Sequence, residues 1–149
     1  MLIGIIGGSK CNKKTKKLAE EVGSEIAKRR HTLVCGGMGG VMEAVCRGAK
    51  KSGGLTIGIL PGKSKEDANK YIDIPIITAM SHARNAIIVR TADIVIAISG
   101  SYGTLSEIGL AKSIDKKVIG LNTWDIPGIK KIDSIKQMIE EIEKAGDRE

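Results

Sequence analysis

The sequence predicts a doubly wound α/β fold in one domain over residues 1–149, with a parallel sheet between two layers of helices. Short apolar runs alternate with segments of helical periodicity along almost the whole chain. The runs are continuously apolar, as in strands that are covered on both faces. Glycine-rich turns follow three of these runs. Repeated β–α units of this kind are joined by right-handed crossovers and give a three-layer α/β/α arrangement.

The predicted strands are aliphatic, because the chain contains no Phe, one Trp and two Tyr. The run LIGIIG near the N-terminus is typical of a central parallel strand. Pro75 favours an edge position for its strand, because proline cannot donate a ladder hydrogen bond. The expected strands cover residues 2–7, 32–37, 55–60, 72–78, 92–98 and 116–122.

The predicted helices fill most of the intervals between these strands. In the first helix, Leu18, Ala19, Val22 and Ile26 recur at helical spacing. The polar segment 63–70 and the segment TWDIPG are expected to be loops. The alternation is typical of a Rossmann-like domain. The expected helices cover residues 12–30, 40–51, 81–92, 105–114 and 132–144.

The charge balance indicates a basic surface rather than a nucleic-acid interface. Lys and Arg number 24 against 17 Asp and Glu, a net charge of +7, and many lysines come in adjacent pairs. The scarcity of aromatic residues leaves little platform for stacking bases of a single strand. We therefore expect solvated lysines and no nucleic-acid partner, with DNA binding as a third and weakest alternative.

The cysteines and the N-terminus indicate a cytoplasmic protein. Cys11, Cys35 and Cys46 form no CxxC pair, so neither a disulfide framework nor a zinc site is expected. The N-terminus enters a strand directly and has no charged region before it, unlike a signal peptide. No apolar stretch is long enough to cross a membrane.

Three glycine-rich turns are the strongest functional signal. They are GGS at 7–9, GGMGG at 36–40 and GSYGT at 100–104, each after a predicted strand. The carboxyl ends of parallel strands meet at one edge of a sheet, and N–H groups at helix starts bind anions there. For the turn 36–40, tight packing without a ligand is the alternative. The expected phosphate-binding residues are Gly8, Ser9, Gly36, Gly37, Gly39, Gly40, Gly100, Ser101, Gly103 and Thr104.

The turns match neither GxGxxG nor GxxxxGK[ST], so NAD binding and ATP hydrolysis lack their sequence signatures. Thr104 and Glu107 have capping-box spacing, which gives Glu107 a structural alternative to a role beside a ribose or a water molecule. Arg84 could form a surface salt bridge or fork onto a phosphate. His82 is expected to be polar surface. Trp124 could cover a base or plug the end of the core, and we favour the plug.

These pieces together resemble the Lonely Guy (LOG) phosphoribohydrolases and their Rossmann-like relatives, some of which carry a lysine decarboxylase label. CGGMGGVME stands where that family has GGGxxGLMG, His82 to Asn85 stand for HxRK, and SGSYGTLSE stands for PGGxGTxxE. The resemblance implies that Arg84 and Glu107 are the catalytic pair, and that the turn 100–104 binds phosphate. No motif for a pyridoxal-phosphate lysine is present, so decarboxylation is not expected.

The chain also departs from the LOG pattern. Ser99 replaces its Pro, Ser101 its second Gly, and Asn85 the Lys after the arginine. The segment from Arg84 to Ala111 looks closer to a sister branch that includes molybdenum-cofactor carrier proteins. These proteins bind a phosphate-bearing pterin and need not hydrolyse it.

The resulting expectation is a binder of a phosphorylated, nucleotide-like small molecule that hydrolyses the N-glycosidic bond of nucleoside 5′-monophosphates. The alternative is a non-catalytic carrier of a phosphorylated cofactor such as molybdopterin. No cofactor is required in the first case, and molybdopterin is the bound ligand in the second. The resemblance also implies a homo-oligomer, for which an aliphatic helical face with Ile87 and Ile88 could serve.

Overall fold

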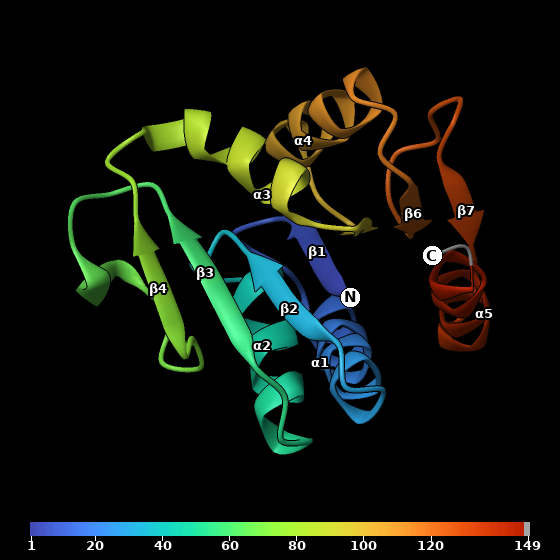
Figure 1. Ribbon diagram of the computed structural model, residues 1–149, viewed down its shortest axis with the longest axis horizontal. Helices are drawn as coiled ribbons and strands as arrows, with labels where there is room; N and C mark the ends of the chain where they lie inside the picture. The colour runs from blue at the N-terminus through green and yellow to red at the C-terminus, as the bar shows by residue number, and fades with distance from the viewer. Residues whose placement is uncertain (148–149) are drawn as a thin grey trace.

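Seven strands form one parallel sheet in the order β4-β3-β2-β1-β5-β6-β7 in the computed structural model, which describes residues 1–147 (Figure 1). The strand order reverses between β1 and β5, where open α/β sheets place their ligand crevice. The strands are β1 (Leu2–Gly7), β2 (Thr32–Cys35), β3 (Thr56–Leu60), β4 (Ile74–Ile77), β5 (Ile94–Ile98), β6 (Val118–Leu121) and β7 (Lys130–Ile132).

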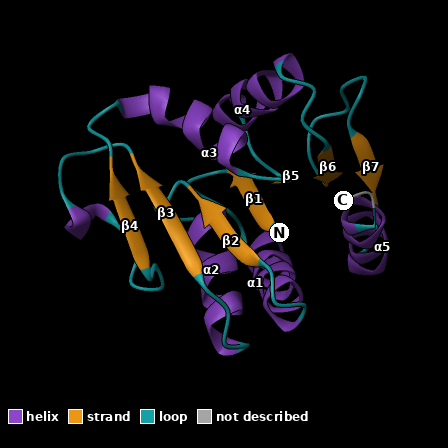
Figure 2. Cartoon of the chain, in the orientation of Figure 1, coloured by secondary structure: helices purple, strands orange, loops and turns teal. Residues whose placement is uncertain are grey.

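Helices cover both faces of the sheet (Figure 2). α1, α2 and α5 lie on one face, and α3 and α4 lie on the other. Two short 3₁₀ turns, Lys65–Asp67 and Ser81–Arg84, precede β4 and α3. The helices are α1 (Lys13–Lys28), α2 (Val41–Lys51), α3 (Asn85–Thr91), α4 (Tyr102–Ser113) and α5 (Ile135–Gly146).

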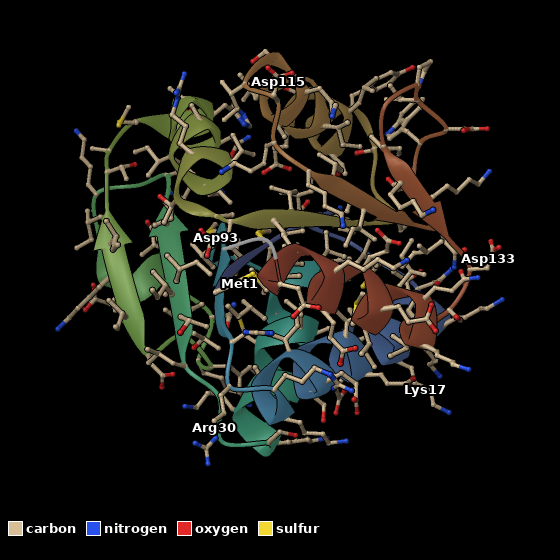
Figure 3. All side chains as sticks on the ribbon, turned by 45° about the vertical axis from the view of Figure 1, so that its right-hand side comes forward. Met1, Lys17, Arg30, Asp93, Asp115 and Asp133 are labelled. Carbon is tan, nitrogen blue, oxygen red and sulfur yellow. The ribbon has the colours of Figure 1, made fainter. Side chains whose placement is uncertain are left out.

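The core is aliphatic, as the composition requires. Its largest fully buried side chains are all Ile and Leu, and they form one cluster on each face of the sheet. Charged side chains such as Lys17 and Asp133 project outward (Figure 3). Asp93 is also exposed, but it accepts a 2.7 Å hydrogen bond from the Leu2 N–H and thereby ties the start of β5 to that of β1.

The predicted Rossmann-like α/β class is confirmed, including the six expected strands and the edge position of Pro75 in β4. One strand was not predicted. β7 has the sequence KKI, and only Ile132 is buried, so neither its length nor its pattern marks it as a strand. α4 begins at Tyr102, three residues earlier than expected, because the glycine-rich turn itself enters the helix.

The aliphatic face expected on the helix at 81–92 is not available for assembly. Ile88 is fully buried in the core and Ile87 is partly buried, because α3 packs this side against the sheet. Large exposed apolar side chains lie instead on and beside the edge strand β4, at Ile74, Ile76, Ile77 and Met80. Within residues 1–147, no helix combines the length and apolar character that a membrane crossing needs.

Candidate functional site

The three glycine-rich turns meet at the carboxyl ends of β1, β2 and β5. The Val41 N–H donates a 3.0 Å hydrogen bond to the Gly8 carbonyl. Gly40 has φ of +64°, and a Cβ there would lie 2.3 Å from the same carbonyl oxygen, so this close approach requires glycine. A Cβ placed on Gly8 would lie 3.8 Å from Gly100 Cα. The turns therefore converge as the sequence predicts.

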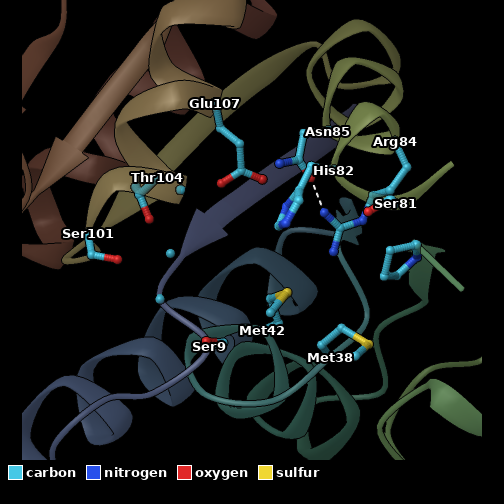
Figure 4. Close-up of a pocket in the computed structure, with 14 residues that line it drawn as sticks. Ser9, Met38, Met42, Ser81, His82, Arg84, Asn85, Ser101, Thr104 and Glu107 are labelled. Carbon is cyan, nitrogen blue, oxygen red and sulfur yellow. Dashed lines mark hydrogen bonds between the residues drawn. The ribbon is translucent and has the colours of Figure 1, made fainter.

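A cavity of about 350 Å³ opens where the turns meet (Figure 4). Its volume falls in the range of about 300–1,000 Å³ that is usual for small-molecule sites. The lining comes from the ends of β1 and β3, the turn after β2, the start of α2, the 3₁₀ turn before α3, and α4. The lining residues are Gly7, Gly8, Ser9, Met38, Met42, Pro61, Ser81, His82, Arg84, Asn85, Ser101, Gly103, Thr104 and Glu107.

Glu107 places a buried carboxylate at this cavity. Its residue is 8% exposed, and within residues 1–147 no group donates a hydrogen bond to its carboxylate. Burial raises the pKa of Glu107 to about 7, although the positive charge of Arg84 acts in the opposite direction. At neutral pH this carboxyl group is therefore divided between its protonated and ionised forms.

Arg84 is buried beside the cavity, with 7% of its surface exposed, and binds mostly to backbone carbonyls. Its Nε donates to the Ile59 carbonyl at 2.8 Å, and one terminal nitrogen donates to the Gly36 carbonyl at 3.4 Å. The other terminal nitrogen donates to the Asn85 side-chain oxygen. Burial lowers the pKa of Arg84, and the charge of Glu107 opposes this effect. The guanidinium thus connects β3, the turn after β2 and α3.

The surface salt bridge considered for Arg84 is therefore not formed, and among the described residues no ion pair joins it to Glu107. A guanidinium carries five N–H groups, of which three are used by these protein acceptors. Two N–H groups remain for a molecule in the cavity.

The start of α4 presents backbone donors to the same space. The first intrahelical hydrogen bond runs from the Leu105 N–H to the Ser101 carbonyl, at 3.0 Å. The N–H groups of Tyr102, Gly103 and Thr104 precede this bond and are available to an anion. The Thr104 residue is 2% exposed, and within residues 1–147 its hydroxyl has no hydrogen-bond partner.

The capping box considered for TLSE is not formed. Because α4 starts at Tyr102, Thr104 lies within the first turn instead of capping it, and Ser101 is the N-cap residue without a side-chain cap bond. Glu107 consequently lies in the second turn, where its side chain enters the cavity (Figure 4).

The predicted phosphate-binding residues separate into two groups. Gly8, Ser9, Ser101, Gly103 and Thr104 line the main cavity with Arg84 and Glu107. The remaining five lie outside it, at Gly36, Gly37, Gly39, Gly40 and Gly100.

Three of these five glycines lie in different environments. Gly100 lines a neighbouring hollow with Lys10, and Gly40 lines a third hollow. Gly37 packs against β3, since a Cβ there would lie 2.6 Å from a Leu60 methyl group, so close packing explains this glycine.

Sequence reasoning assigned no role to several residues of the lining. The sequence predicts ordinary polar surface for His82 and marks Asn85 only as a departure from the LOG pattern. The position of Met38 inside a glycine-rich turn was the one available signal for an apolar lining. The lining residues without a predicted role are Gly7, Met38, Met42, Pro61, Ser81, His82 and Asn85.

Trp124 packs against the core cluster on the α3–α4 side of the sheet, which agrees with the plug interpretation. Its indole N–H donates to the Ser101 carbonyl at 3.0 Å. Its ring contacts Tyr102, with 5.7 Å between ring centroids. Neither aromatic residue lines the main cavity.

The fold and this cavity define a LOG-like member of the Rossmann-like α/β proteins. The family model described as "SLOG cluster4 family" matches residues 1–147. The chain belongs to the SLOG cluster4 family.

Relatives in this group differ in what their names describe. A protein of Archaeoglobus fulgidus, described as uncharacterized, is 49% identical over 121 residues, which cover 81% of this chain and 80% of that protein. The cytokinin riboside 5′-monophosphate phosphoribohydrolase of Mycobacterium tuberculosis is 36% identical over 118 residues, or 72% of this chain. The match spans 63% of the length of that enzyme.

A solved structure is similar over nearly the whole chain. The molybdenum cofactor binding protein of Rippkaea orientalis superposes with a TM-score of 0.91 at 37% identity. The match covers 96% of this chain and 95% of that one. The similarities therefore include a hydrolase and a cofactor-binding protein.

Proposed function

We propose that the chain binds a phosphorylated, nucleotide-like ligand in the cavity between β1 and α4. The observation that carries this proposal is the pair Thr104 and Glu107. Both are more than nine-tenths buried, both face the cavity, and neither has a side-chain partner within residues 1–147. Within residues 1–147 no side-chain nitrogen or oxygen atom is buried without a hydrogen-bond partner, so the oxygens of Thr104 and Glu107 are open to the cavity. A ligand with hydroxyl and phosphate groups would form hydrogen bonds with them.

The start of α4 is the proposed phosphate site. The N–H groups of Gly103 and Thr104 and the Thr104 hydroxyl would donate to the phosphate oxygens. The positive end of the helix dipole adds a favourable interaction with the negative charge.

The proposed reaction is hydrolysis of the N-glycosidic bond of a nucleoside 5′-monophosphate. The water oxygen forms a bond to C1′ while the bond from C1′ to the base nitrogen breaks. The electron pair of that bond leaves with the base, which takes up a proton from solvent. Ionised Glu107 accepts a proton from the water and stabilises the positive charge that develops on the sugar. Arg84 orients the ligand through its two remaining N–H groups.

A non-catalytic carrier of a phosphorylated pterin such as molybdopterin is the second candidate function. One observation favours it. Asn85 stands where the LOG pattern has lysine, so the site holds one positive charge fewer. The similarity to the Rippkaea orientalis protein is consistent with this candidate.

A turnover assay separates the two candidates. The protein is incubated with a panel of nucleoside 5′-monophosphates, and free base is measured by chromatography, with Glu107→Gln as the matched variant. If the protein is a hydrolase, the unmodified protein should release free base. The rate of release should fall by roughly 100-fold or more in Glu107→Gln, as for loss of a general base. Binding without base release supports the carrier. Full activity of Glu107→Gln would contradict the role of Glu107.

A further inference from the structure

The cavity has a polar end and an apolar end. Ser101 and Thr104 lie at one end, together with the start of α4. Met38, Met42 and Pro61 contribute an apolar wall. Figure 4 shows Met38 and Met42 across the cavity from Ser101 and Thr104, with Glu107 beside Thr104 on α4 and the Arg84 guanidinium on the side of the methionines. A ligand with chemically different ends therefore has a preferred direction here.

The apolar wall is held in place by the turn after β2. A Cβ on Gly36 would lie 2.8 Å from the Met42 sulfur and 2.6 Å from an Arg84 terminal nitrogen. The Met42 thioether and the Arg84 guanidinium thus both pack on this glycine. Met42 is 8% exposed and belongs to the core cluster, whereas Met38 is partly buried and lies in the turn itself. Met42 is thus a fixed part of the wall, and Met38 is its more accessible part.

We infer that Met38 and Met42 bind the planar ring of the ligand and determine its specificity. Thioether sulfur atoms make favourable contacts with aromatic rings, often at the ring edge. Ser81 and His82 line the same cavity and supply polar groups for the nitrogen and oxygen atoms of a heteroaromatic ring. With the phosphate on α4 and the ring on the methionines, the linking sugar or chain lies near Glu107. The ligand class is a heteroaromatic ring joined to a phosphate.

The aromatic pair Tyr102 and Trp124 is the other candidate platform for a ring. Tyr102 is 79% exposed and Trp124 is anchored to the Ser101 carbonyl. Neither residue lines the cavity that contains Thr104 and Glu107. The methionine wall shares that cavity, so it is the surface that a ring attached to the bound phosphate reaches.

This inference rests on the proposed function, and a comparison of ligands with and without a ring tests it separately. Calorimetric titration measures the affinity for ribose 5-phosphate and for formycin 5′-monophosphate, an AMP analogue whose carbon–carbon link to the base resists hydrolysis. Met38→Ala is the test variant, because Met38 lies in a turn and is only partly buried. Met80→Ala is the matched control, because Met80 is 46% exposed and lies outside the cavity lining.

The expected result is that Met38→Ala weakens binding of formycin 5′-monophosphate by about twofold to tenfold, the range of a methionine–aromatic contact. Binding of ribose 5-phosphate stays unchanged, Met80→Ala changes neither affinity, and Met38→Leu restores most of the loss. Neopterin monophosphate serves as a pterin arm. If Met38→Ala weakens binding of only one of the two ring-bearing ligands, the result supports the ring subsite and shows whether it takes a purine or a pterin.

Equal weakening of ring-bearing and ring-free ligands in Met38→Ala, or no weakening at all, would overturn the ring subsite while leaving the phosphate site intact. Failure of the unmodified protein to bind any of the three phosphorylated probes would overturn the proposed function itself. The two failures therefore give different results in the same titrations.

Discussion

Glu107 is buried, and its carboxylate has no hydrogen-bond partner within residues 1–147. The nearby Arg84 guanidinium forms no ion pair with it. Arg84 uses three donors on Ile59, Gly36 and Asn85, so its charge offsets only part of the burial effect on Glu107. The carboxylate therefore remains destabilised in the protein without a ligand. Such perturbed groups in a cavity are typical of functional sites.

This arrangement predicts a pH-dependent effect of Glu107→Gln on stability. The folded-state pKa of about 7 lies above the ordinary value of 4.5, so the native state holds the proton more tightly than the unfolded chain. The contribution of Glu107 to the free energy of unfolding should fall as pH rises from about 4.5 through about 7. Glutamine does not titrate, so the variant should gain on the order of 3 kcal/mol relative to the unmodified protein over this interval.

Urea denaturation at about pH 5 and about pH 8.5 measures this difference. Glu140→Gln, on the exposed surface of α5, controls for the general effect of removing one negative charge. A stability difference between Glu107→Gln and the unmodified protein that is the same at both pH values would contradict the burial effect.

The sequence predicts which residues belong to the site, but not which groups they bind in the folded protein. The SGSYGTLSE segment indicated Thr104 and Glu107, because a strand followed by glycines and a helix start is a local pattern. The carbonyl partners of Arg84 come from β3 and from the turn after β2, 25 and 48 residues away along the chain. No local pattern encodes such contacts, so the burial of Arg84 became visible only in the folded structure.

The helices and strands contribute to the site mainly through the turns that join them. Gly40 lies against the Gly8 carbonyl with φ of +64°, and this contact connects the end of β1 to the start of α2. Gly109, by contrast, lies in the interior of α4 and has open space where a Cβ would be. The two glycines therefore have different reasons to be present.

Gly40 and Gly109 give opposite predictions for the free energy of unfolding when each is replaced by alanine. Gly40→Ala should destabilise the fold by more than about 2 kcal/mol, because it adds left-handed strain of about 1–2 kcal/mol to a clash with the Gly8 carbonyl. Gly109→Ala should stabilise it by about 0.5–1 kcal/mol, because alanine is the better helix former. Chemical denaturation of both variants checks the signs. A neutral Gly40→Ala would show that the turns are not in tight contact.

The elements themselves were largely predictable, since continuous apolar runs and helical spacing are local signals. The sequence does not predict β7, because a three-residue segment with two exposed lysines has no strand pattern. The start of α4 was placed too late because glycine and tyrosine in SGSYGT do not indicate a helix, although Tyr102 begins one.

At the scale of the whole molecule, the strand order determines where the site lies. The reversal between β1 and β5 brings the turns 7–9 and 100–104 side by side, and the turn 36–40 joins them through β2. The alternation of elements predicts a parallel sheet, but the order of its strands depends on long-range pairing. Right-handed crossovers restrict that order without specifying it.

The exposed edge of the sheet gives a prediction about assembly. Ile74 and Ile76 on β4 are 44% and 43% exposed, and a cluster of exposed apolar side chains favours burial against another chain. We predict a homo-oligomer in which two β4 edges associate about a two-fold axis. Light scattering should give a multiple of the monomer mass, and the double variant Ile74→Lys with Ile76→Lys should give the monomer. An unchanged mass in that variant would contradict this interface.

The most direct test of the phosphate site is a crystal structure with formycin 5′-monophosphate. We expect phosphate oxygens at about 3 Å from the N–H groups of Gly103 and Thr104 and from the Thr104 hydroxyl. The ring should then lie against Met38 and Met42. A phosphate bound instead to the surface lysines of α1, with the start of α4 in contact only with water, would contradict it.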